Sequence, residues 1–535
     1  MAKKKQKRYY RRTIDLLFLL VLLIVCILSF YAAFTFGMLP RKWIFMLMAL
    51  FGIIYLILFI VSLKKMPTWF VVIKRIFIIM LVVLLATSGY FINRSKKTVA
   101  NITKTNSGGT SEIYVIAKKD SSIATLDDLS GKIVGYQSGI DKKNADFVKQ
   151  EIESKVSNTT PVEEIDYTTL SENLENGLIN ALVISDNFYN MTKANMEGFG
   201  NSVKTIKTYS KKNEVVKQKK DIAKDVFTVY LSGLDNAGSP DQTTRSDTNL
   251  ILIVNPISNH IDMVSLPRDG YIPNPALKNA NDKLTHTAMY GIENSVNAIQ
   301  TFFNIPIDYY ARVSFTSLAK IVDTVGGIDV DVELDVCAYD ESTYRTTEEN
   351  QKTHEGQITV CIKKGPSKLN GAQALIYARH RKTEGYDNPG RERAQQRIIK
   401  GIINKLLSPN GLVYAQDLMA IVPNFVITNM PNDQITSFIS SELGDLKPWS
   451  ISSLASDTGV FDSQYVASLD PANGYSDVYL FNKEEIHSII NTYDAAQKQL
   501  QLDTFNFNVT NLYKNTPEIT NDPSIVWDTM ARDPH

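Results

Sequence analysis

The amino-acid sequence predicts a membrane-anchored α/β protein whose main domain has three layers, with helices on both faces of a mixed central sheet. Three apolar runs near the N-terminus are each long enough to cross a bilayer. Beyond Asp225, short β-branched strands alternate with amphipathic helices, which is typical of an α/β/α domain. Two neighbouring strands are separated by a tight turn and should pair antiparallel, so the sheet is expected to be mixed.

The composition limits the class of protein. The 535 residues exceed one ordinary domain, and the net charge of +1 provides no basic field that would gather nucleic acid. Three cysteines are too few for a disulfide scaffold or a structural zinc site, and Cys337 and Cys361 form either one disulfide or two free thiols. We expect six segments in order: a membrane anchor (1–97), a linker (98–110), an α/β accessory domain (111–210), a second linker (211–224), the main domain (225–515) and a polar tail (516–535).

The anchor consists of the apolar runs Ile14 to Phe36, Trp43 to Leu63 and Phe70 to Ile92. A cleaved signal peptide would be shorter and would not be followed by two further spans. Lysines and arginines gather before the first run and around the turn between the second and third, so the positive-inside rule places the N-terminus in the cytoplasm. After an odd number of spans, the rest of the chain is expected outside.

The accessory domain is predicted from a short α/β pattern. Glu112 to Ala117 and Ile133 to Tyr136 alternate like strands, and Asn144 to Ser154 has helical apolar spacing. The phrase LDDLSGKIVGYQSG weakly resembles part of an extracellular solute-binding domain. Because no dense cluster of chemically active residues occurs there, a spacer or accessory role is favoured. The lysine-rich stretch that follows is expected to be a linker.

The main domain is expected to begin near Asp225. Its predicted strands are Phe227–Gly233, Asn249–Asn255, Ile261–Leu266, Tyr309–Phe315 and Ile328–Leu334, and its predicted helices are Glu293–Phe303, Thr316–Val325, Asn370–Tyr377 and Arg391–Leu407. Gly326 and Gly327 are expected to end the helix that precedes them. No chemistry is apparent beyond Pro409, where the chain is expected to complete the α/β domain.

Two acidic residues and two arginines are expected to meet at one edge of the sheet. Asp235 follows the first strand, Arg245 and Asp247 precede the second, and Arg268 follows the third. The second and third strands form an antiparallel hairpin, so the start of the second lies beside the end of the third. If the first strand neighbours this hairpin, its end lies at the same edge of the sheet. Each residue alone would more simply belong to a surface salt-bridge cluster, but together they indicate a site.

Further polar residues lie at the end of one later predicted helix and at the start of the next. Arg379 and Arg381 are two apart and would share one face if the chain continues extended after Tyr377; the alternative is a helix C-terminus that favours cations. Arg391 and Gln395 share a face on the first turn of the last predicted helix, whose free N–H groups also suit a phosphate.

Arginines that converge with carboxylates suit a phosphate-bearing ligand together with a divalent cation, because guanidinium groups match phosphate oxygens and carboxylates hold Mg²⁺. Covalent catalysis is not indicated, since the six histidines form no HExxH motif and no GxSxG motif occurs.

The main domain resembles the LytR–CpsA–Psr family from about Asp225 to Leu407. The phrases that carry the resemblance are SGLD, RSDTNLILIVNP, SLPRD, KLTHTAMYG, FTSLAKIVDTVGGIDVDVE, LNGAQALIYARHR and GRERAQQR, in that order. The three-span anchor and the accessory domain are similar to those of the streptococcal capsule-type members.

The resemblance implies a phosphotransferase that moves a capsular polysaccharide or exopolysaccharide from polyprenyl pyrophosphate onto peptidoglycan. The reaction would take place at the outer face of the cell membrane of a Gram-positive bacterium, with Mg²⁺ or Mn²⁺ as cofactor. Other polysaccharide-export proteins are further expected partners, and nucleic acid is not.

Roles for individual residues follow from the resemblance. Asp235 and Asp247 would hold the metal; Arg245, Arg268, Arg379, Arg381, Arg391 and Gln395 would bind the pyrophosphate; and Asp235, Asp247, Arg268 and Asp387 would form the catalytic set. Two positions depart from the family pattern. Asn388 stands where an acidic residue is usual, with Asp387 one earlier, and Ala394 stands where an arginine is usual, with Arg393 one earlier.

Two other functions are compatible with the sequence. One is a non-enzymatic regulator of polysaccharide synthesis that acts through the spans and the accessory domain, and the other is a polyprenyl-pyrophosphate hydrolase with water as acceptor. A cytoplasmic transcription factor is disfavoured, because only short basic segments face inward and no DNA-reading motif follows.

Overall fold

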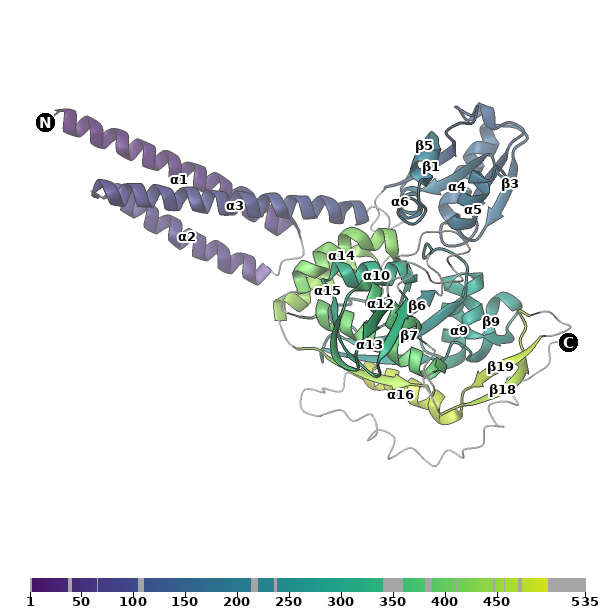
Figure 1. The fold of residues 1–535 in the computed structure, drawn as a ribbon. Coiled ribbons are helices and arrows are strands. Elements are labelled where there is room, and N and C mark those ends of the chain that lie inside the picture. Colours follow the sequence, from purple (N-terminus) through teal and green to yellow (C-terminus); the bar gives the residue numbers. More distant parts are fainter. Residues whose placement is uncertain are drawn as a thin grey trace. The chain divides into compact units, whose positions relative to one another are not determined.

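The computed structural model describes residues 2–36, 41–64, 66–103, 110–212, 220–234, 238–339, 359–380, 387–408, 411–445, 448–456, 458–469 and 474–498 (Figure 1). The chain divides into two compact units. The first comprises Met1–Thr103 and Asn432–Lys447, and the second comprises Lys104–Pro431 and Pro448–His535.

The first unit is helical. It contains α1 (Ala2–Phe36), α2 (Arg41–Leu63), α3 (Thr68–Thr103) and α15 (Asn432–Asp445). The segments Arg12–Thr35, Arg41–Leu63 and Thr68–Asn93 are long and apolar enough to cross a membrane, as the three hydrophobic runs predict. A polar contact joins two of them, because Lys74 of α3 donates to Asp15 of α1.

In the second unit, residues 110–212 form a five-stranded sheet of order β3-β2-β4-β1-β5. The elements are β1 (Thr110–Lys118), η1 (Asp127–Leu129), β2 (Ile133–Gln137), α4 (Lys142–Lys155), β3 (Thr160–Glu164), α5 (Tyr167–Glu175), β4 (Ala181–Ser185), α6 (Asp186–Asn195), α7 (Phe199–Ser202) and β5 (Val203–Lys212). The predicted first two strands and the helix match β1, β2 and α4. Lys211 and Lys212, expected in a linker, instead belong to β5. We call residues 110–212 the accessory unit.

A six-stranded mixed sheet of order β16-β11-β6-β7-β8-β17 forms the centre of the main domain. Its strands are β6 (Phe227–Leu234), β7 (Ser246–Asn255), β8 (His260–Leu266), β11 (Tyr309–Val313), β16 (Ile427–Thr428) and β17 (Ser450–Ala455). β7 pairs antiparallel with both β6 and β8, while β11 and β17 add parallel strands outside them. The expected mixed sheet is confirmed.

Helices cover both faces of this sheet (Figure 1). α9 (Ile292–Phe303) and α16 (Lys483–Gln497) share a buried core with Tyr230, Ile251 and Ile253 of the sheet. On the other side lie α10 (Phe315–Thr324), α12 (Gly371–Arg379), α13 (Asp387–Leu406) and α14 (Gly411–Phe425). The three-layer α/β/α architecture is therefore confirmed.

Glycines end α10 as predicted. Gly326 and Gly327 have φ values of +72° and +85°, a conformation that costs glycine little. A Cβ on Gly327 would also lie 2.9 Å from the carbonyl oxygen of Leu369, so no larger residue fits without movement of the backbone.

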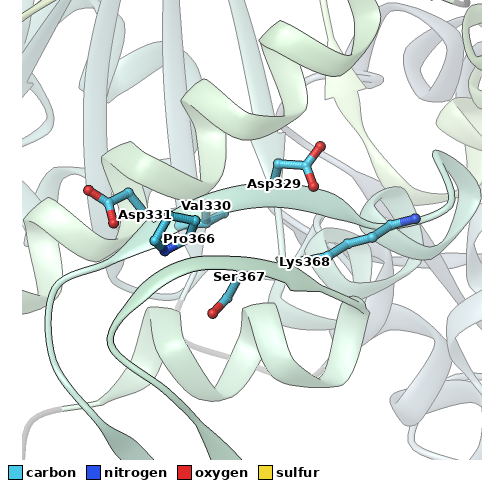
Figure 2. A pocket seen from close by; sticks show the side chains of 6 residues that line it. All are labelled: Asp329, Val330, Asp331, Pro366, Ser367 and Lys368. Carbon is cyan, nitrogen blue, oxygen red and sulfur yellow. The ribbon is translucent and has the colours of Figure 1, made fainter.

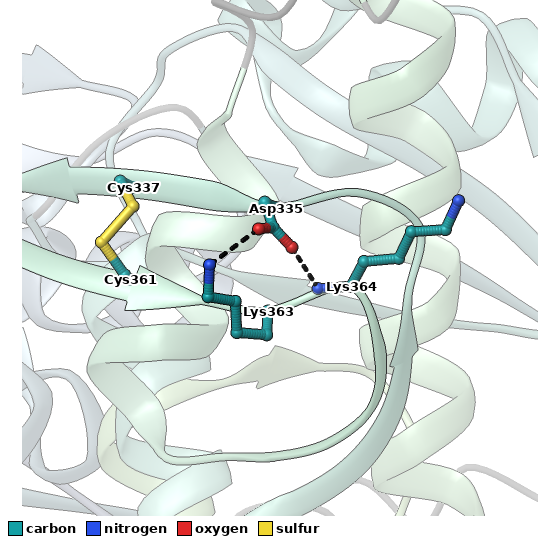
Figure 3. Close-up of a disulfide and its surroundings, with 5 residues drawn as sticks. All are labelled: Asp335, Cys337, Cys361, Lys363 and Lys364. Carbon is teal, nitrogen blue, oxygen red and sulfur yellow. Dashed lines mark hydrogen bonds and ion pairs between the residues drawn. A yellow bond between two sulfur atoms is a disulfide. The ribbon is translucent and has the colours of Figure 1, made fainter.

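Short paired strands and single turns complete the main domain. They are β9 (Tyr271–Asn274), η2 (Pro275–Leu277), β10 (Ala280–Lys283), α8 (Leu284–Thr287), η3 (Ala288–Tyr290), β12 (Ile328–Val332), β13 (Val336–Tyr339), β14 (Thr359–Ile362), β15 (Gly365–Leu369), β18 (Val460–Tyr465) and β19 (Tyr475–Leu480). Cys337 of β13 and Cys361 of β14 form a disulfide (Figure 3), which decides between the two states that the sequence allows. A depression of about 310 Å³ lies on the β12–β15 ribbon (Figure 2) and contains none of the predicted site residues.

Candidate active site

The strand ends meet as the chain order predicts. Leu234 at the end of β6 pairs with Ser246 at the start of β7, and Asn249 of β7 pairs with Leu266 at the end of β8. Asp247 and the residues that follow β8, including Arg268, therefore lie at one edge of the sheet. Asp235 directly follows Leu234 but lies outside the described residues.

A buried carboxylate between two guanidinium groups forms the centre of this edge. Nη1 of Arg268 lies 2.5 Å from Oδ1 of Asp247, and Nη1 of Arg391 lies 3.0 Å from Oδ2. Asp247 and Arg391 are each only 2% exposed. We call Asp247, Arg268 and Arg391 the Asp247 cluster. It has one negative and two positive side chains, so it carries an excess positive charge that suits an anion.

Arg391 and Gln395 carry buried polar atoms whose hydrogen bonds the described part of the chain does not supply. Nε and Nη2 of Arg391, and Oε1 of Gln395, have no hydrogen-bond partner among the residues that the structure describes. Unsatisfied buried guanidinium donors are costly in the absence of a ligand. Phosphate oxygens would satisfy these N–H groups.

Helix α13 places Arg391 and Gln395 together because residues four apart share a face. Ala394, Ile398 and Ile402 bury the adjacent face in a second hydrophobic core. The helix begins at Asp387 rather than at the expected Arg391, so Arg391 lies one turn inside it. The prediction that Arg391 stands on the first turn, beside free backbone N–H groups, is therefore wrong.

The chain around Arg268 is fixed by the KLTHTAMYG segment. The N–H of Thr285 donates to the carbonyl oxygen of Arg268 at 2.8 Å. Nζ of Lys283 lies 3.0 Å from Oδ1 of Asp269, next to Arg268. These contacts hold the turn after β8 against β10 and α8, and with it the position of the Arg268 side chain.

Arg379 and Arg245 are the other predicted site residues that the structure describes. Arg379 is the last residue of α12, which continues two residues beyond its expected end, and its guanidinium carbon lies 4.8 Å from the ring centre of Phe315. The prediction that the chain is extended after Tyr377 is therefore wrong for Arg379, which is helical. Arg245 is exposed just before β7. Arg381 and the side chain of Asp387 lie outside the described residues.

The two departures from the family pattern lie on the same helix. Ala394 is fully buried in the second core. Arg393 pairs with Glu333, which directly follows β12, with its Nη2 3.1 Å from Oε1. Arg393 thus has a partner apart from the Asp247 cluster and does not replace the arginine missing at Ala394.

Glu392 is a residue of interest that sequence reasoning missed. Burial raises the pKa of its carboxyl to about 7, and the charges of Asp269 and Asp247 add to this effect, whereas the backbone N–H and the charge of Arg268 oppose it. A carboxyl that titrates near neutral pH beside buried charges is a candidate proton acceptor. In the sequence, only its position next to Arg391 sets Glu392 apart from other glutamates.

The described residues contain no group of three or more His, Cys, Asp or Glu that could hold a metal ion. Of the two expected ligands, Asp247 is described, and its two oxygens face arginines. Asp247 supplies one carboxylate of the kind that Mg²⁺ prefers, and the second expected ligand, Asp235, lies outside the described residues.

Comparisons with known proteins agree with the motifs. The family model described as the LytR_cpsA_psr family matches residues 192–493, more than half of the chain. The polyisoprenyl-teichoic acid–peptidoglycan teichoic acid transferase TagU of Bacillus subtilis (strain 168) is 33% identical over 225 residues; the match covers 42% of this chain and 66% of that protein, just under two thirds.

Two solved structures are also similar. TagT of B. subtilis gives a TM-score of 0.37 at 23% identity, covering 53% of this chain and 95% of that one. The protein gbs0355 from Streptococcus agalactiae gives 0.42 at 21% identity, covering 53% and 92%. From the extent of the family match, the chain belongs to the LytR–CpsA–Psr family.

Proposed function

We propose that the protein is a transferase that moves a glycopolymer from a polyprenyl-pyrophosphate carrier onto peptidoglycan. The observation that supports it best is the Asp247 cluster, in which Nε and Nη2 of the buried Arg391 have no hydrogen-bond partner among the described residues. A pyrophosphate would accept these hydrogen bonds and compensate the excess positive charge. The relative TagU is named for transfer of teichoic acid to peptidoglycan, which is the same class of reaction.

In the proposed reaction, a peptidoglycan hydroxyl attacks the phosphorus that carries the glycan. A new phosphorus–oxygen bond forms, the bond from that phosphorus to the bridging oxygen breaks, and polyprenyl monophosphate leaves with the electron pair. The hydroxyl proton passes to a carboxylate of the protein. Arg268 and Arg391 stabilise the charge on the phosphate oxygens, which is the main requirement of phosphoryl transfer.

The polymer and the location are further parts of the proposal. We propose a capsular polysaccharide or exopolysaccharide as the polymer, with teichoic acid, named for the relative TagU, as the competing substrate. The distribution of lysines and arginines supports a cytoplasmic N-terminus and a main domain outside the membrane of a Gram-positive bacterium. A lipid-borne pyrophosphate is an activated donor that does not require ATP in that compartment.

We also propose that Mg²⁺ or Mn²⁺ binds through Asp235 and Asp247, with Arg245 beside them. This proposal rests on the sequence resemblance and on the carboxylate chemistry of these two residues. When bound, such an ion would neutralise charge on the diphosphate.

The function is tested with the full-length chain purified in detergent. We expect mass spectrometry to identify a co-purifying polyprenyl phosphate or pyrophosphate, and reconstituted transfer to release polyprenyl monophosphate while glycan becomes attached to peptidoglycan. EDTA should abolish transfer and added Mg²⁺ should restore it. Glycan transfer that persists unchanged in Arg268→Ala would refute the site. Release of free glycan would indicate the hydrolase, and altered polymer amount without transfer would indicate the regulator.

Glu392 predicts the pH dependence of transfer. The carboxylate must be deprotonated to accept the hydroxyl proton, and its pKa is raised to about 7. The rate should therefore rise about tenfold per pH unit below neutrality and level off near pH 8. Glu392→Gln should lower kcat roughly 10²–10⁴-fold and remove this dependence. If Asp387→Asn removes it and Glu392→Gln does not, Asp387 is the proton acceptor.

A further inference from the structure

The segment Gly238–Arg245 joins β6 to β7 and delivers the chain to Asp247. It contacts the accessory unit at the carboxyl ends of its parallel strands. β2 pairs parallel with both β3 and β4, and α5 begins just after β3. Open α/β sheets generally bind ligands outside the carboxyl ends of their parallel strands. In this protein a side chain of the main domain occupies that position.

That side chain is Asp241, which lies at the N-terminus of α5. Its Oδ2 accepts hydrogen bonds from the backbone N–H groups of Tyr167 at 2.8 Å and Thr168 at 3.1 Å. Its Oδ1 accepts one from the Thr168 hydroxyl at 2.9 Å. Asp241 is only 6% exposed. A carboxylate at a helix N-terminus also interacts favourably with the helix dipole, so Asp241 binds there as an internal anion.

A second carboxylate makes the reciprocal contact. Asp166 is the N-cap of α5 and accepts a hydrogen bond from the N–H of Thr169 at 2.7 Å. Its other oxygen accepts from the backbone N–H and the hydroxyl of Thr243, in the segment Gly238–Arg245. Each domain therefore contributes one aspartate to the other. The two contacts involve Asp241 and Thr243, which are two residues apart in the segment.

The main domain holds the segment from its other side. Nη2 of Arg312, on β11, donates to the carbonyl oxygen of Gln242 at 2.7 Å, between the two contacts to α5. Arg312 is 2% exposed, and burial lowers its pKa to about 10 while the nearby Asp241 and Asp166 counteract that effect. The segment is thus fixed between a buried guanidinium and a helix N-terminus.

Apolar packing joins the two domains beside these contacts. Met191 of α6 is part of the main hydrophobic core, and Ile140 and Phe188 pack against it. All three precede residue 192, where the family match begins. The accessory unit therefore packs on the main domain through residues that the family match does not include.

We propose that the accessory unit positions the segment Gly238–Arg245, through Asp241 and Asp166, so that Arg245 and Asp247 are held ready for the lipid pyrophosphate. Asp241 and Asp166 are positioning residues that do not contact the reacting atoms. The consequence for transfer rests on the proposed function, whereas the fixation of the segment does not.

The test uses the full-length chain with Asp241→Ala, Asp241→Asn and Thr243→Val. Amide hydrogen exchange is measured by mass spectrometry on peptides that cover 238–247 and 250–254. Asp128→Ala is the matched control, because Asp128 also accepts from two backbone N–H groups and one threonine hydroxyl, all within its own loop of the accessory unit. Transfer by each variant is resolved into kcat and KM.

We expect Asp241→Ala to accelerate exchange in 238–247 at least tenfold and to lower kcat/KM about tenfold, with 250–254 unchanged. Thr243→Val should have a smaller effect of the same kind. Asp241→Asn should stay near wild type, since its amide oxygen accepts from both N–H groups and its NH₂ donates to the Thr168 hydroxyl. Asp128→Ala should change neither quantity.

Unchanged exchange in 238–247 for Asp241→Ala would overturn the inference, as would equal losses of transfer in Asp241→Ala and Asp128→Ala. Exchange is measured without substrate. A wild-type protein that shows no transfer therefore contradicts the proposed function, while the exchange result still decides whether the accessory unit fixes the segment.

Discussion

Replacing Arg391 by methionine is expected to abolish most glycopolymer transfer while leaving the ligand-free protein about as stable as the wild type. Two of the Arg391 donors are buried without a hydrogen-bond partner among the described residues, which costs free energy until a ligand accepts them. In the variant, Asp247 still pairs with the guanidinium of Arg268, whose Nη1 lies 2.5 Å from Oδ1 of Asp247. We therefore expect the free energy of unfolding to change by about 1 kcal/mol, less than the roughly 3–5 kcal/mol for an orphaned buried charge.

Arg391→Met should change the transfer rate and the stabilisation by lipid far more than the stability of the ligand-free protein. Loss of one charge-stabilising group is expected to lower kcat by roughly 10²–10³-fold. Polyprenyl pyrophosphate at about one hundred times its Kd should stabilise the wild type by about 2.7 kcal/mol, and this stabilisation should largely disappear in Arg391→Met. Thermal unfolding with and without the lipid, beside the transfer assay, measures both.

Arg393→Ala is the matched control, because Arg393 lies two residues further along α13 and pairs with Glu333. It should retain transfer and lipid-dependent stabilisation. The opposite pattern, with Arg391→Met strongly destabilised but still stabilised by lipid, would make Arg391 a structural residue and remove the main support for the proposed site.

The parts of the site that the sequence predicts are those determined by neighbouring strands. Asp247 and Arg268 could be placed together because a tight turn makes β7 and β8 antiparallel, and antiparallel pairing brings the start of one strand to the end of the next. Arg391 could be added only through the family resemblance, since 144 residues separate it from Asp247.

Other features depend on packing that no local pattern specifies. Helix α13 begins four residues before its expected start, although Asn388 and Pro389 indicate a turn; proline is well tolerated in the first turn of a helix, so the two signals overlap. The pKa of Glu392 depends on burial and on charges brought from β7 and β8. Asp241 looks like an ordinary loop residue in the sequence, because its partners are backbone N–H groups about seventy residues away.

The membrane anchor provides the second large expected effect, because Asp15→Leu should strongly destabilise the helix bundle. Nζ of Lys74 lies 2.6 Å from Oδ2 of Asp15, and Nε of Arg75 lies 2.8 Å from Oδ1. The Lys74 side chain is only 4% exposed, and its further partner, the Ser62 hydroxyl, is uncharged. Removing the carboxylate leaves a buried ammonium without a counter-charge, which typically costs about 3–5 kcal/mol.

Cys26 reports on this bundle directly, because it packs against the buried core of the first three helices and its thiol is free. A thiol-reactive fluorophore added to the detergent-solubilised chain during heating should label Cys26 at a clearly lower temperature in Asp15→Leu. Ser29→Ala, which removes one hydrogen bond to the carbonyl oxygen of Leu85, should shift labelling only slightly, as expected for about 0.6 kcal/mol.

The double variant Asp15→Leu with Lys74→Met separates loss of charge balance from loss of packing. Apolar side chains of similar length can replace a buried ion pair at little cost, so this variant should regain most of the wild-type labelling temperature. Arg75 is 25% exposed and can extend towards the membrane surface. If the double variant is as labile as Asp15→Leu, the carboxylate is required by Arg75 rather than by Lys74, and the buried ammonium is not the source of the instability.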